Sequence, residues 1–422
     1  MKIIATSDWH LGNLFHGNDR LEEHRDFLSW LLERLEEDRP DALLVAGDVF
    51  DNGNPSAAAQ EAYYEFLADA TQRCPGMTIV ITAGNHDSAS RLEAPRALLS
   101  RHRVEIRGNV HREWKTSEEE RGHWVVNYED LMIPLKGKDG GEVIVLAVPF
   151  LRSDIVLNSS YSAGVNQFLS ALTDQAREKF PGKPLLMMAH LYATGATVAS
   201  SDASEKIIVG GQEQVDMGDW TAHPDYLTCG HIHKRQKING WARYTGSVLP
   251  MSFAECDYSH GVDLITFENG VAAPEVRFIE YTPQHKLCVL PKSDEALTTK
   301  QLTKLLTETL PDRTDGKLDG NFVYLSLKVK MDKVNNDEIK EIEALVETKN
   351  AVLCKIQKIL PAIDLSAVGA GEKIHSVDDI LNRDPLDTLG EAFSLIVKKE
   401  MSPHQRQLLS DLLKLTLSDE IH

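Results

Sequence analysis

Five short segments of the chain carry side chains that together could bind two metal ions. In chain order they are D-W-H at residues 8–10, G-D-V-F-D at 47–51, G-N-H-D at 84–87, His190 alone, and G-H-I-H at 230–233. Any one of them is a weak signal, because D-x-H and H-x-H occur often by chance. The ordered set, each member following an apolar strand-like run, predicts a metal-dependent phosphoesterase, and among these a nuclease.

The candidate metal ligands are carboxylates, imidazoles and one carboxamide, namely Asp8, His10, Asp48, Asn85, His190, His231 and His233. A donor set without thiolates suits Mn²⁺, Fe²⁺ or Zn²⁺ better than Ca²⁺, which prefers oxygen ligands alone. His190 taken by itself would be interpreted as a buried histidine at a strand end. As a member of the set, it is predicted to be a ligand.

Two ions about 3.5–4 Å apart need one anionic ligand between them. Asp48 is the natural bridging ligand, because it lies in the middle of the set and follows Gly47, which lets the backbone approach closely. The expected ligand sets are Asp8, His10 and Asp48 with one histidine of the H-x-H pair, and Asp48, Asn85 and His190 with the other.

Four further residues are candidates for the chemistry or for substrate contact. His86 follows a ligand directly, so it is predicted to assist the leaving-group oxygen without binding metal. Asp51 is predicted to accept a proton from one ring nitrogen of His86 and to fix its tautomer, although it could instead cap the turn after its strand. His16 and Arg20, which follow the first segment, are candidates for substrate binding.

The first 280 residues alternate between strand-like and helix-like patterns. Strands are predicted at 3–6, 42–46, 77–83, 143–148, 185–189 and 226–229, with further β structure at 242–248 and 262–267. Helices are predicted at 21–35, 55–71, 91–101 and 163–180, and a hairpin or excursion within 115–142. The alternation predicts an α/β fold with a largely parallel sheet covered by helices on both faces. The ligands follow strand ends, where such sheets place their sites.

The remainder of the chain has a different character. Residues 283–360 follow the order strand, helix, strand, helix, strand without a ligand pattern, which predicts a small accessory α+β domain beside a catalytic domain at 1–280. A linker is predicted at 361–375 and a helical segment at 376–422. Within that segment, Ser402-Pro403 is a favourable helix start, and leucines at 408, 409, 412 and 413 form an apolar stripe.

Charge and cysteine content restrict the class of protein. The formal net charge is −19, whereas a protein that holds DNA alone in a basic groove would carry excess Lys and Arg. Either the substrate is not a long polyanion, or metals and a partner supply the positive charge.

Five scattered cysteines without a C-x-x-C predict reduced thiols. No apolar run approaches the roughly 20 residues that span a bilayer, so we expect a cytoplasmic protein, nucleoid-associated when acting on DNA.

The five segments, in this order, resemble the calcineurin-like metallophosphoesterase superfamily. Longer motifs resemble one of its branches closely, namely T-S-D-W-H-L-G (6–12), A-G-D-V-F-D (46–51), A-G-N-H-D (83–87), C-G-H-I-H (229–233) and G-S-V-L-P-M-S-F (246–253). Over roughly residues 1–280 they are most similar to the branch of bacterial exonuclease subunits related to the Mre-type DNA repair nucleases. This resemblance implies a β-sandwich flanked by helices, a capping domain at 283–360 that contacts DNA, and C-terminal helices that dock on the coiled-coil base of an ABC-type ATPase.

The same resemblance implies roles for individual residues. It assigns Asp8, His10, Asp48 and His233 to one manganese, Asp48, Asn85, His190 and His231 to the other, and the catalytic histidine to His86. It also implies a two-fold homodimer, formed through helices near 55–71 and 91–101, within a heterotetramer with the ATPase. The implied activity is manganese-dependent 3′→5′ exonuclease action on duplex DNA and endonuclease action on single strands and hairpins, controlled by ATP binding to the partner.

Two other interpretations remain open. A phosphoprotein phosphatase or a cyclic-nucleotide phosphodiesterase of the same superfamily would use the same two-metal core. Against this stand the W-H-L-G continuation at residues 9–12 and the two appended modules, which an esterase of small substrates would not need. A scaffold without activity would be expected to have lost ligands, and here the full set is present.

Overall fold

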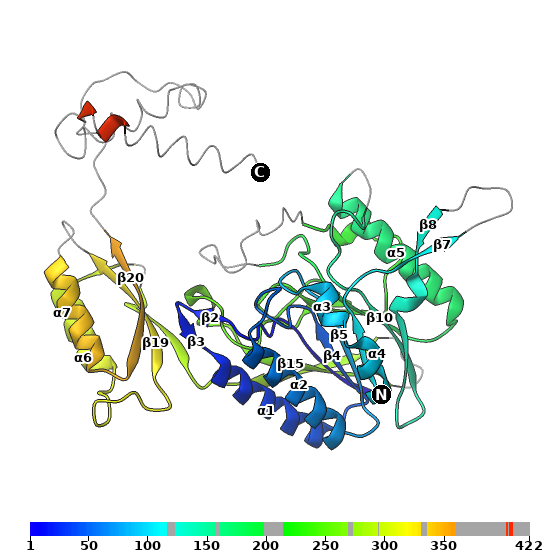
Figure 1. Cartoon of the computed structure of the whole chain (residues 1–422), viewed down its shortest axis with the longest axis horizontal. Helices are drawn as coiled ribbons and strands as arrows, with labels where there is room; N and C mark the ends of the chain where they lie inside the picture. The colour runs from blue at the N-terminus through cyan, green and yellow to red at the C-terminus, as the bar shows by residue number, and fades with distance from the viewer. Residues whose placement is uncertain are drawn as a thin grey trace. The chain divides into compact units, whose positions relative to one another are not determined.

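Two six-stranded sheets that pack face to face form the larger part of the fold (Figure 1). The computed structural model describes residues 1–115, 123–156, 160–197, 214–268, 273–293, 295–330, 336–359, 402–403 and 405–407. The chain divides into the units Met1–Ile359 and Leu360–His422. Both sheets lie in the first unit.

Each large sheet has a parallel centre; antiparallel strands flank it on one side in the first sheet and on both sides in the second. The first has the order β16 (Glu275–Tyr281), β15 (His260–Thr266), β1 (Lys2–Thr6), β4 (Ala42–Ala46), β5 (Thr78–Thr82) and β6 (Val104–Arg107). The second has the order β13 (Gln236–Lys237), β14 (Ala242–Tyr244), β12 (Tyr226–Gly230), β11 (Leu185–His190), β10 (Glu142–Ala147) and β9 (Met132–Lys136). Strands β1, β4, β5 and β6 run parallel, as do β10, β11, β12 and β14.

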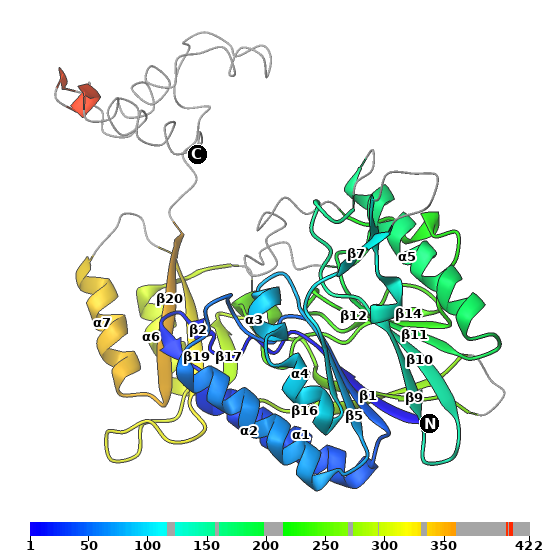
Figure 2. The same ribbon diagram turned by 45° about the vertical axis from the view of Figure 1, so that its right-hand side comes forward.

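In the part of the chain that the structure describes, helices cover only the outer face of each sheet. Helices α1 (Leu21–Asp38) and α2 (Ala57–Arg73) lie side by side on the first sheet, and α5 (Tyr161–Lys179) packs on the second (Figure 2). The prediction of one sheet with helices on both faces is therefore wrong. The α/β sandwich flanked by helices, which the family resemblance implied, is the fold observed.

The alternation of residues along β4 shows why these strands are apolar at every position. Leu43 and Val45 pack in the core beneath α1 and α2, whereas Ala42, Leu44 and Ala46 pack in the core between the sheets. Both faces of the strand are buried, one by helices and one by the second sheet. A strand buried on both faces has the same continuous apolar pattern in either architecture.

Several details differ from the predicted elements. The helix predicted at 91–101 is interrupted: α3 (Ala89–Glu93) and α4 (Arg96–Leu99) flank Pro95, which has no amide proton for a helix interior. A 3-10 helix at Ser100–His102 follows α4. The excursion at 115–142 contains the hairpin of β7 (Arg112–Lys115) and β8 (His123–Val126), and β9 then joins the second sheet. Short strands β2 (Leu14–Phe15) and β3 (Asn18–Asp19) form a small hairpin before α1.

A separate small sheet follows the sandwich, centred on β19 (Val323–Lys330). It contains β17 (Lys286–Leu290), β18 (Leu297–Thr298) and β20 (Ala351–Ile359), all parallel to β19. Helices α6 (Thr299–Thr309) and α7 (Asn336–Glu347) share its apolar core. The order of elements is the one predicted for 283–360, while the division of the chain into functional domains remains a prediction.

The predicted linker at 361–375 lies outside the described residues, and so does most of the segment at 376–422. At the predicted helix start, the Ser402 hydroxyl accepts a hydrogen bond from the Gln405 amide, and the Gln405 side chain accepts one from the Ser402 amide. This reciprocal pair is a capping box. Among helices in the described ranges, none has the length and apolar character needed to cross a membrane.

Replacing Leu31 tests the packing of α1 on the first sheet. Leu31 is fully buried in the core between the first sheet and helices α1 and α2. Leu31→Ala should therefore lower the free energy of unfolding by about 2–5 kcal/mol. Leu14→Ala is the control, because Leu14 is 62% exposed, and it should change stability by less than about 0.5 kcal/mol. Urea denaturation of the two variants measures the difference, and equal losses would contradict this packing.

Candidate metal centre

The candidate ligands come together where strands of both sheets end. Asp8, Asp48 and Asn85 follow β1, β4 and β5 of the first sheet. His190 ends β11, and His231 follows β12, both of the second sheet. The sandwich thus brings residues more than 200 positions apart within hydrogen-bond distance, as the bond from the His231 amide to the Asp8 carboxylate shows (2.9 Å).

The backbone at four of these positions is strained. Asp8, His10, Asp48 and His231 have φ values of 52°, 48°, 48° and 96°. Residues with a Cβ rarely adopt such values, and each costs on the order of 1–3 kcal/mol. Strain of this kind persists where the surrounding structure dictates the conformation, and it clusters at functional sites.

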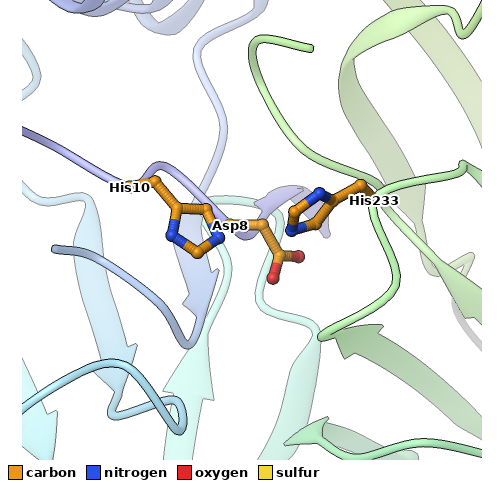
Figure 3. A group of neighbouring side chains, drawn as sticks. All are labelled: Asp8, His10 and His233. Carbon is orange, nitrogen blue, oxygen red and sulfur yellow. The ribbon is translucent and has the colours of Figure 1, made fainter. Parts of the chain in front are cut away.

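The first donor group contains Asp8, His10 and His233 (Figure 3). Their potential ligand atoms all lie within 4.8 Å of one another, and all three residues are buried. The His10 and His233 rings flank the Asp8 carboxylate, with ring centroids 5.2 Å apart. Both ring nitrogens of His10 lack a hydrogen-bond partner although they are buried, which is costly unless something else binds them.

The second donor group surrounds the side-chain oxygen of Asn85. His190 Nε2 lies 2.9 Å from Asn85 Oδ1, and His231 Nδ1 lies 3.0 Å from the same oxygen. His190 Nε2 is also 3.3 Å from Asp48 Oδ2. One carboxamide, one carboxylate and two imidazoles therefore point to a common centre, as the assignment to the second ion expects.

Asp48 lies between the two donor groups. Its Oδ2 is 3.3 Å from His190 Nε2 and 3.8 Å from His10 Nε2. Its Oδ1 accepts a hydrogen bond from the His86 amide at 2.8 Å. The carboxylate can therefore reach both groups, which is the position expected of a bridging ligand.

The buried charges strongly shift the ionisation of these side chains. Burial opposes the Asp48 charge, but the neighbouring histidines hold the pKa of Asp48 well below its usual range. Burial also opposes a charged His190, yet the Asp48 carboxylate raises the pKa of His190 to about 9. Burial, and then the charge of His190, lower the pKa of His231 to about 3. The buried negative charge of the Asp48 carboxylate is therefore stabilised by positive charge beside it.

Three glycines allow this close packing. A Cβ on Gly84 would lie 2.1 Å from Asp48 Oδ1, and one on Gly47 would lie 2.3 Å from His190 Nδ1. A Cβ on Gly230 would lie 2.1 Å from the Ala46 carbonyl. Real Cβ atoms do not approach so closely, so only glycine fits beside these ligands.

His86 lies at the edge of the centre, and its orientation differs in one respect from the prediction. Its Nδ1 donates to the backbone carbonyl of Asp51 at 2.8 Å, rather than to the Asp51 carboxylate. That carboxylate accepts a hydrogen bond from Asn13 and lies 3.6 Å from His10 Nδ1. Asp51 thus fixes His86 through its backbone, because its side chain turns toward His10. The other ring nitrogen of His86, Nε2, is then available to face a substrate.

His86 is also a possible metal-binding residue by geometry. It forms a candidate group with His10 and Asp48, and its ring lies 4.9 Å from that of His10. The prediction that His86 binds no metal therefore stays a prediction.

Sequence reasoning missed the groups that orient the ligands. His190 Nδ1 donates to the Ala46 carbonyl at 3.0 Å, and His233 Nδ1 lies 3.0 Å from Glu255 Oε1. Such contacts fix the ring and leave the other nitrogen for a metal. The backbone of Ala46 carries no sequence signal, but Glu255 lies only two residues beyond the quoted motif at 246–253.

The two candidates for substrate contact have different environments. His16 is exposed, as substrate contact requires, and packs on Phe253. Arg20 is 1% exposed, and its guanidinium is held by Glu23 and the Pro250 carbonyl. The expectation that Arg20 contacts substrate is therefore at odds with the structure, in which Arg20 is part of a buried ion pair.

Comparisons with known proteins show the family to which the chain belongs. The calcineurin-like phosphoesterase family matches residues 1–235. The SbcD component of the SbcCD nuclease of Rhodobacter capsulatus is 34% identical over 340 residues, covering 78% of this chain and 80% of its own length. The SbcD component from Escherichia coli K12 is 30% identical over 437 aligned positions, covering 99% of this chain and 98% of its own.

The chain therefore belongs to the calcineurin-like phosphoesterase family, and it is a metallophosphoesterase, a hydrolase. Its relatives over most of its length are SbcD nuclease subunits. The resemblance predicted from the sequence motifs is thus confirmed. A dimetal phosphatase from Danio rerio covers 67% of this chain and 99% of its own with a TM-score of 0.34 at 12% identity, which is too low to bear on function.

The contact between Gly84 and Asp48 gives a direct test of the site. Gly84→Ala should displace the Asp48 carboxylate, because the added Cβ would lie 2.1 Å from Oδ1, and should weaken metal binding by about tenfold or more. Gly240→Ala is the matched control, since no atom lies within 4 Å of its added Cβ. Titration of each metal-free variant with Mn²⁺ measures the affinity. Wild-type affinity in Gly84→Ala would contradict the placement of Asp48 at the centre.

Proposed function

We propose that this chain is a manganese-dependent DNA nuclease subunit of the SbcD type, which hydrolyses phosphodiester bonds with two metal ions. The observation that carries the proposal is the convergence of both donor groups on the buried Asp48 carboxylate. The relatives, which are named as components of the SbcCD nuclease, support nuclease activity. The proposed activities are 3′→5′ exonuclease action on duplex DNA and endonuclease action on single strands and hairpins.

The residues present fit two divalent ions. The buried His10 nitrogens, which make no hydrogen bond, and the close approach of Asp48 and His190 are what a centre built around cations would have. The donors are oxygen and nitrogen without sulfur, which suits Mn²⁺, with Fe²⁺ or Zn²⁺ also possible. The proposed ligand sets are Asp8, His10, Asp48 and His233 for one ion, and Asp48, Asn85, His190 and His231 for the other.

When bound, the two ions would supply Lewis acidity toward the phosphate and an activated water nucleophile. The chain itself would orient the reacting groups. His86 Nδ1 donates to the Asp51 carbonyl, so this ring can carry a second proton at Nε2. In that form, His86 would give the proton to the leaving oxygen of the scissile phosphodiester. The buried environment around Asp48 would exclude bulk water and strengthen these interactions.

DNA as substrate has to be reconciled with a net charge of −19. We propose that the metals and the basic surfaces of an SbcC-type ABC ATPase with a coiled coil supply most of the positive charge, and that the isolated chain binds duplex DNA weakly.

The small sheet around β19 is the proposed capping domain that contacts DNA. The segment at 376–422 is the proposed ATPase-binding region. A homodimer through α2 and the α3–α4 region completes the proposed assembly.

Substitution of His86 separates chemistry from metal binding. His86→Ala should keep metal content nearly intact and lower the rate of DNA cleavage by a factor of about 10²–10⁴, the usual contribution of general acid catalysis. His123→Ala is a suitable control, because His123 is exposed on the β7–β8 hairpin. Metal analysis and cleavage of single-stranded circular DNA provide the readouts. Loss of both metals from His86→Ala would place His86 among the ligands instead.

Substrate choice tests the proposal against a phosphoesterase of small or protein substrates. With Mn²⁺, the purified chain should cleave single-stranded circular DNA at a rate well above its rate on a small aryl phosphate diester. Mg²⁺ in place of Mn²⁺ should give weaker cleavage, and addition of the ATPase partner should raise activity on duplex DNA. Action on the small ester alone would favour the other phosphoesterases.

A further inference from the structure

An aromatic cluster joins the small sheet to the loops of the metal centre. Tyr324 of β19 is buried and packs against Phe15 with ring centroids 5.2 Å apart. Phe15 also packs against Phe253 at 5.2 Å. Phe15 lies five residues after His10 in the sequence, and Phe253 begins the 3-10 helix Phe253–Glu255. The small sheet therefore shares one apolar cluster with two segments that also serve the metal centre.

A buried ion pair lies beside this cluster. Arg20 Nε and Nη2 donate to the two carboxylate oxygens of Glu23, both at 2.9 Å. The Arg20 guanidinium lies 5.3 Å from the Phe15 ring centre and 5.6 Å from that of Tyr324. The Tyr324 hydroxyl donates to Glu23 Oε1 at 2.9 Å. Arg20 and Glu23 are 1% and 2% exposed, so the loss of any partner would leave a charge poorly compensated in the interior.

The hydrogen bonds continue from this ion pair to a candidate metal ligand. Arg20 Nη1 donates to the Pro250 carbonyl at 2.5 Å. The amide of the next residue, Met251, donates to Glu255 Oε2 at 2.8 Å, and Glu255 Oε1 lies 3.0 Å from His233 Nδ1. Glu255 is fully buried. One short turn, residues 250–255, thus contacts the ion pair on one side and His233 on the other.

These contacts could serve stability alone, as most buried hydrogen bonds do. In that case their loss would lower stability without changing metal affinity. These contacts lead to a candidate metal ligand, which favours a further role. Hydrogen bonds, together with the peptide bond between Pro250 and Met251, connect Tyr324 of β19 to the His233 ring. A carboxylate on the far nitrogen of a metal-binding histidine fixes the ring and raises its basicity.

We propose that Tyr324, Glu23, Arg20 and Glu255 form a positioning relay, which couples the placement of the small sheet to the orientation of His233. The inference rests on the proposed function, because it takes His233 as a metal ligand. A substrate that shifts the small sheet would change the affinity of the metal site that contains His233. Metal binding would, by reciprocity, restrain the small sheet to the same extent. Substrate contact and metal loading would then be linked.

The test compares two single hydroxyl deletions in the full-length chain. Tyr324→Phe removes only the bond to Glu23. Tyr281→Phe is the matched control, because the Tyr281 hydroxyl donates to Asp26 at 2.6 Å on the same helix, α1, and Asp26 leads to no metal ligand among the contacts above. Mn²⁺ is titrated into each metal-free protein, and the free ion is followed by its EPR signal. Thermal unfolding without metal shows whether the two variants are equally folded.

We expect Tyr324→Phe to weaken one of the two Mn²⁺-binding steps on the order of fivefold, the low end of typical coupling between sites. Tyr281→Phe should leave both steps unchanged. Glu255→Ala should weaken the same step by about 10- to 100-fold. In the double variant Tyr324→Phe/Glu255→Ala, the hydroxyl deletion should cause no further loss, because the path to His233 is already broken.

Wild-type affinity in Tyr324→Phe, or losses that simply add in the double variant, would overturn the relay while leaving the nuclease proposal intact. Equal weakening in Tyr281→Phe would show a general effect of stability and would also overturn it. A wild-type chain that binds two Mn²⁺ ions but cleaves no DNA would refute the nuclease proposal alone. A wild-type chain that binds no Mn²⁺ would overturn both.

Discussion

The burial of the Asp48 carboxylate between the imidazoles of two sheets is the interaction on which the rest of the structure depends. A carboxylate removed from water needs compensating positive charge, and here it lies 3.3 Å from His190 and 3.8 Å from His10. His10 comes from the first sheet and His190 from the second. The core between the sheets, with residues such as Leu44 and Met188, must therefore hold the strand ends in place, and the site exists only in the assembled sandwich.

The local sequence around each ligand follows from this crowding. Gly47, Gly84 and Gly230 each precede a candidate ligand, and each is a position where a Cβ would collide with another part of the centre. Asp8 and Asp48 have left-handed backbone conformations that cost free energy. The glycines and the strained turns therefore reflect the positions of the candidate ligands and not the local preference of the backbone. Such departures are expected at functional sites.

Much of this could be predicted because strand ends and ligand types are local features of the sequence. The apolar runs located β4 and β11, and the structure places Asp48, just after β4, 3.3 Å from His190, the last residue of β11. The number of sheets could not be predicted in the same way, since strands such as β4 are apolar on both faces in either architecture. The burial of Arg20 was missed because Tyr324, which packs on it, lies far away in the sequence. The predicted contact between the Asp51 carboxylate and His86 is absent, because His86 donates to the backbone carbonyl of Asp51 instead. A backbone carbonyl carries no sequence signal.

The continuation of the first motif has a structural purpose that bears on the class of substrate. After supplying Asp8 and His10, the chain forms the β2–β3 hairpin and then enters α1, carrying Phe15 and Glu23 to the small sheet. Here, a segment that begins with two candidate ligands also packs against the small sheet. Such a sheet adds contact area for a substrate that extends beyond the scissile bond, which a polymer such as DNA provides and a small ester does not.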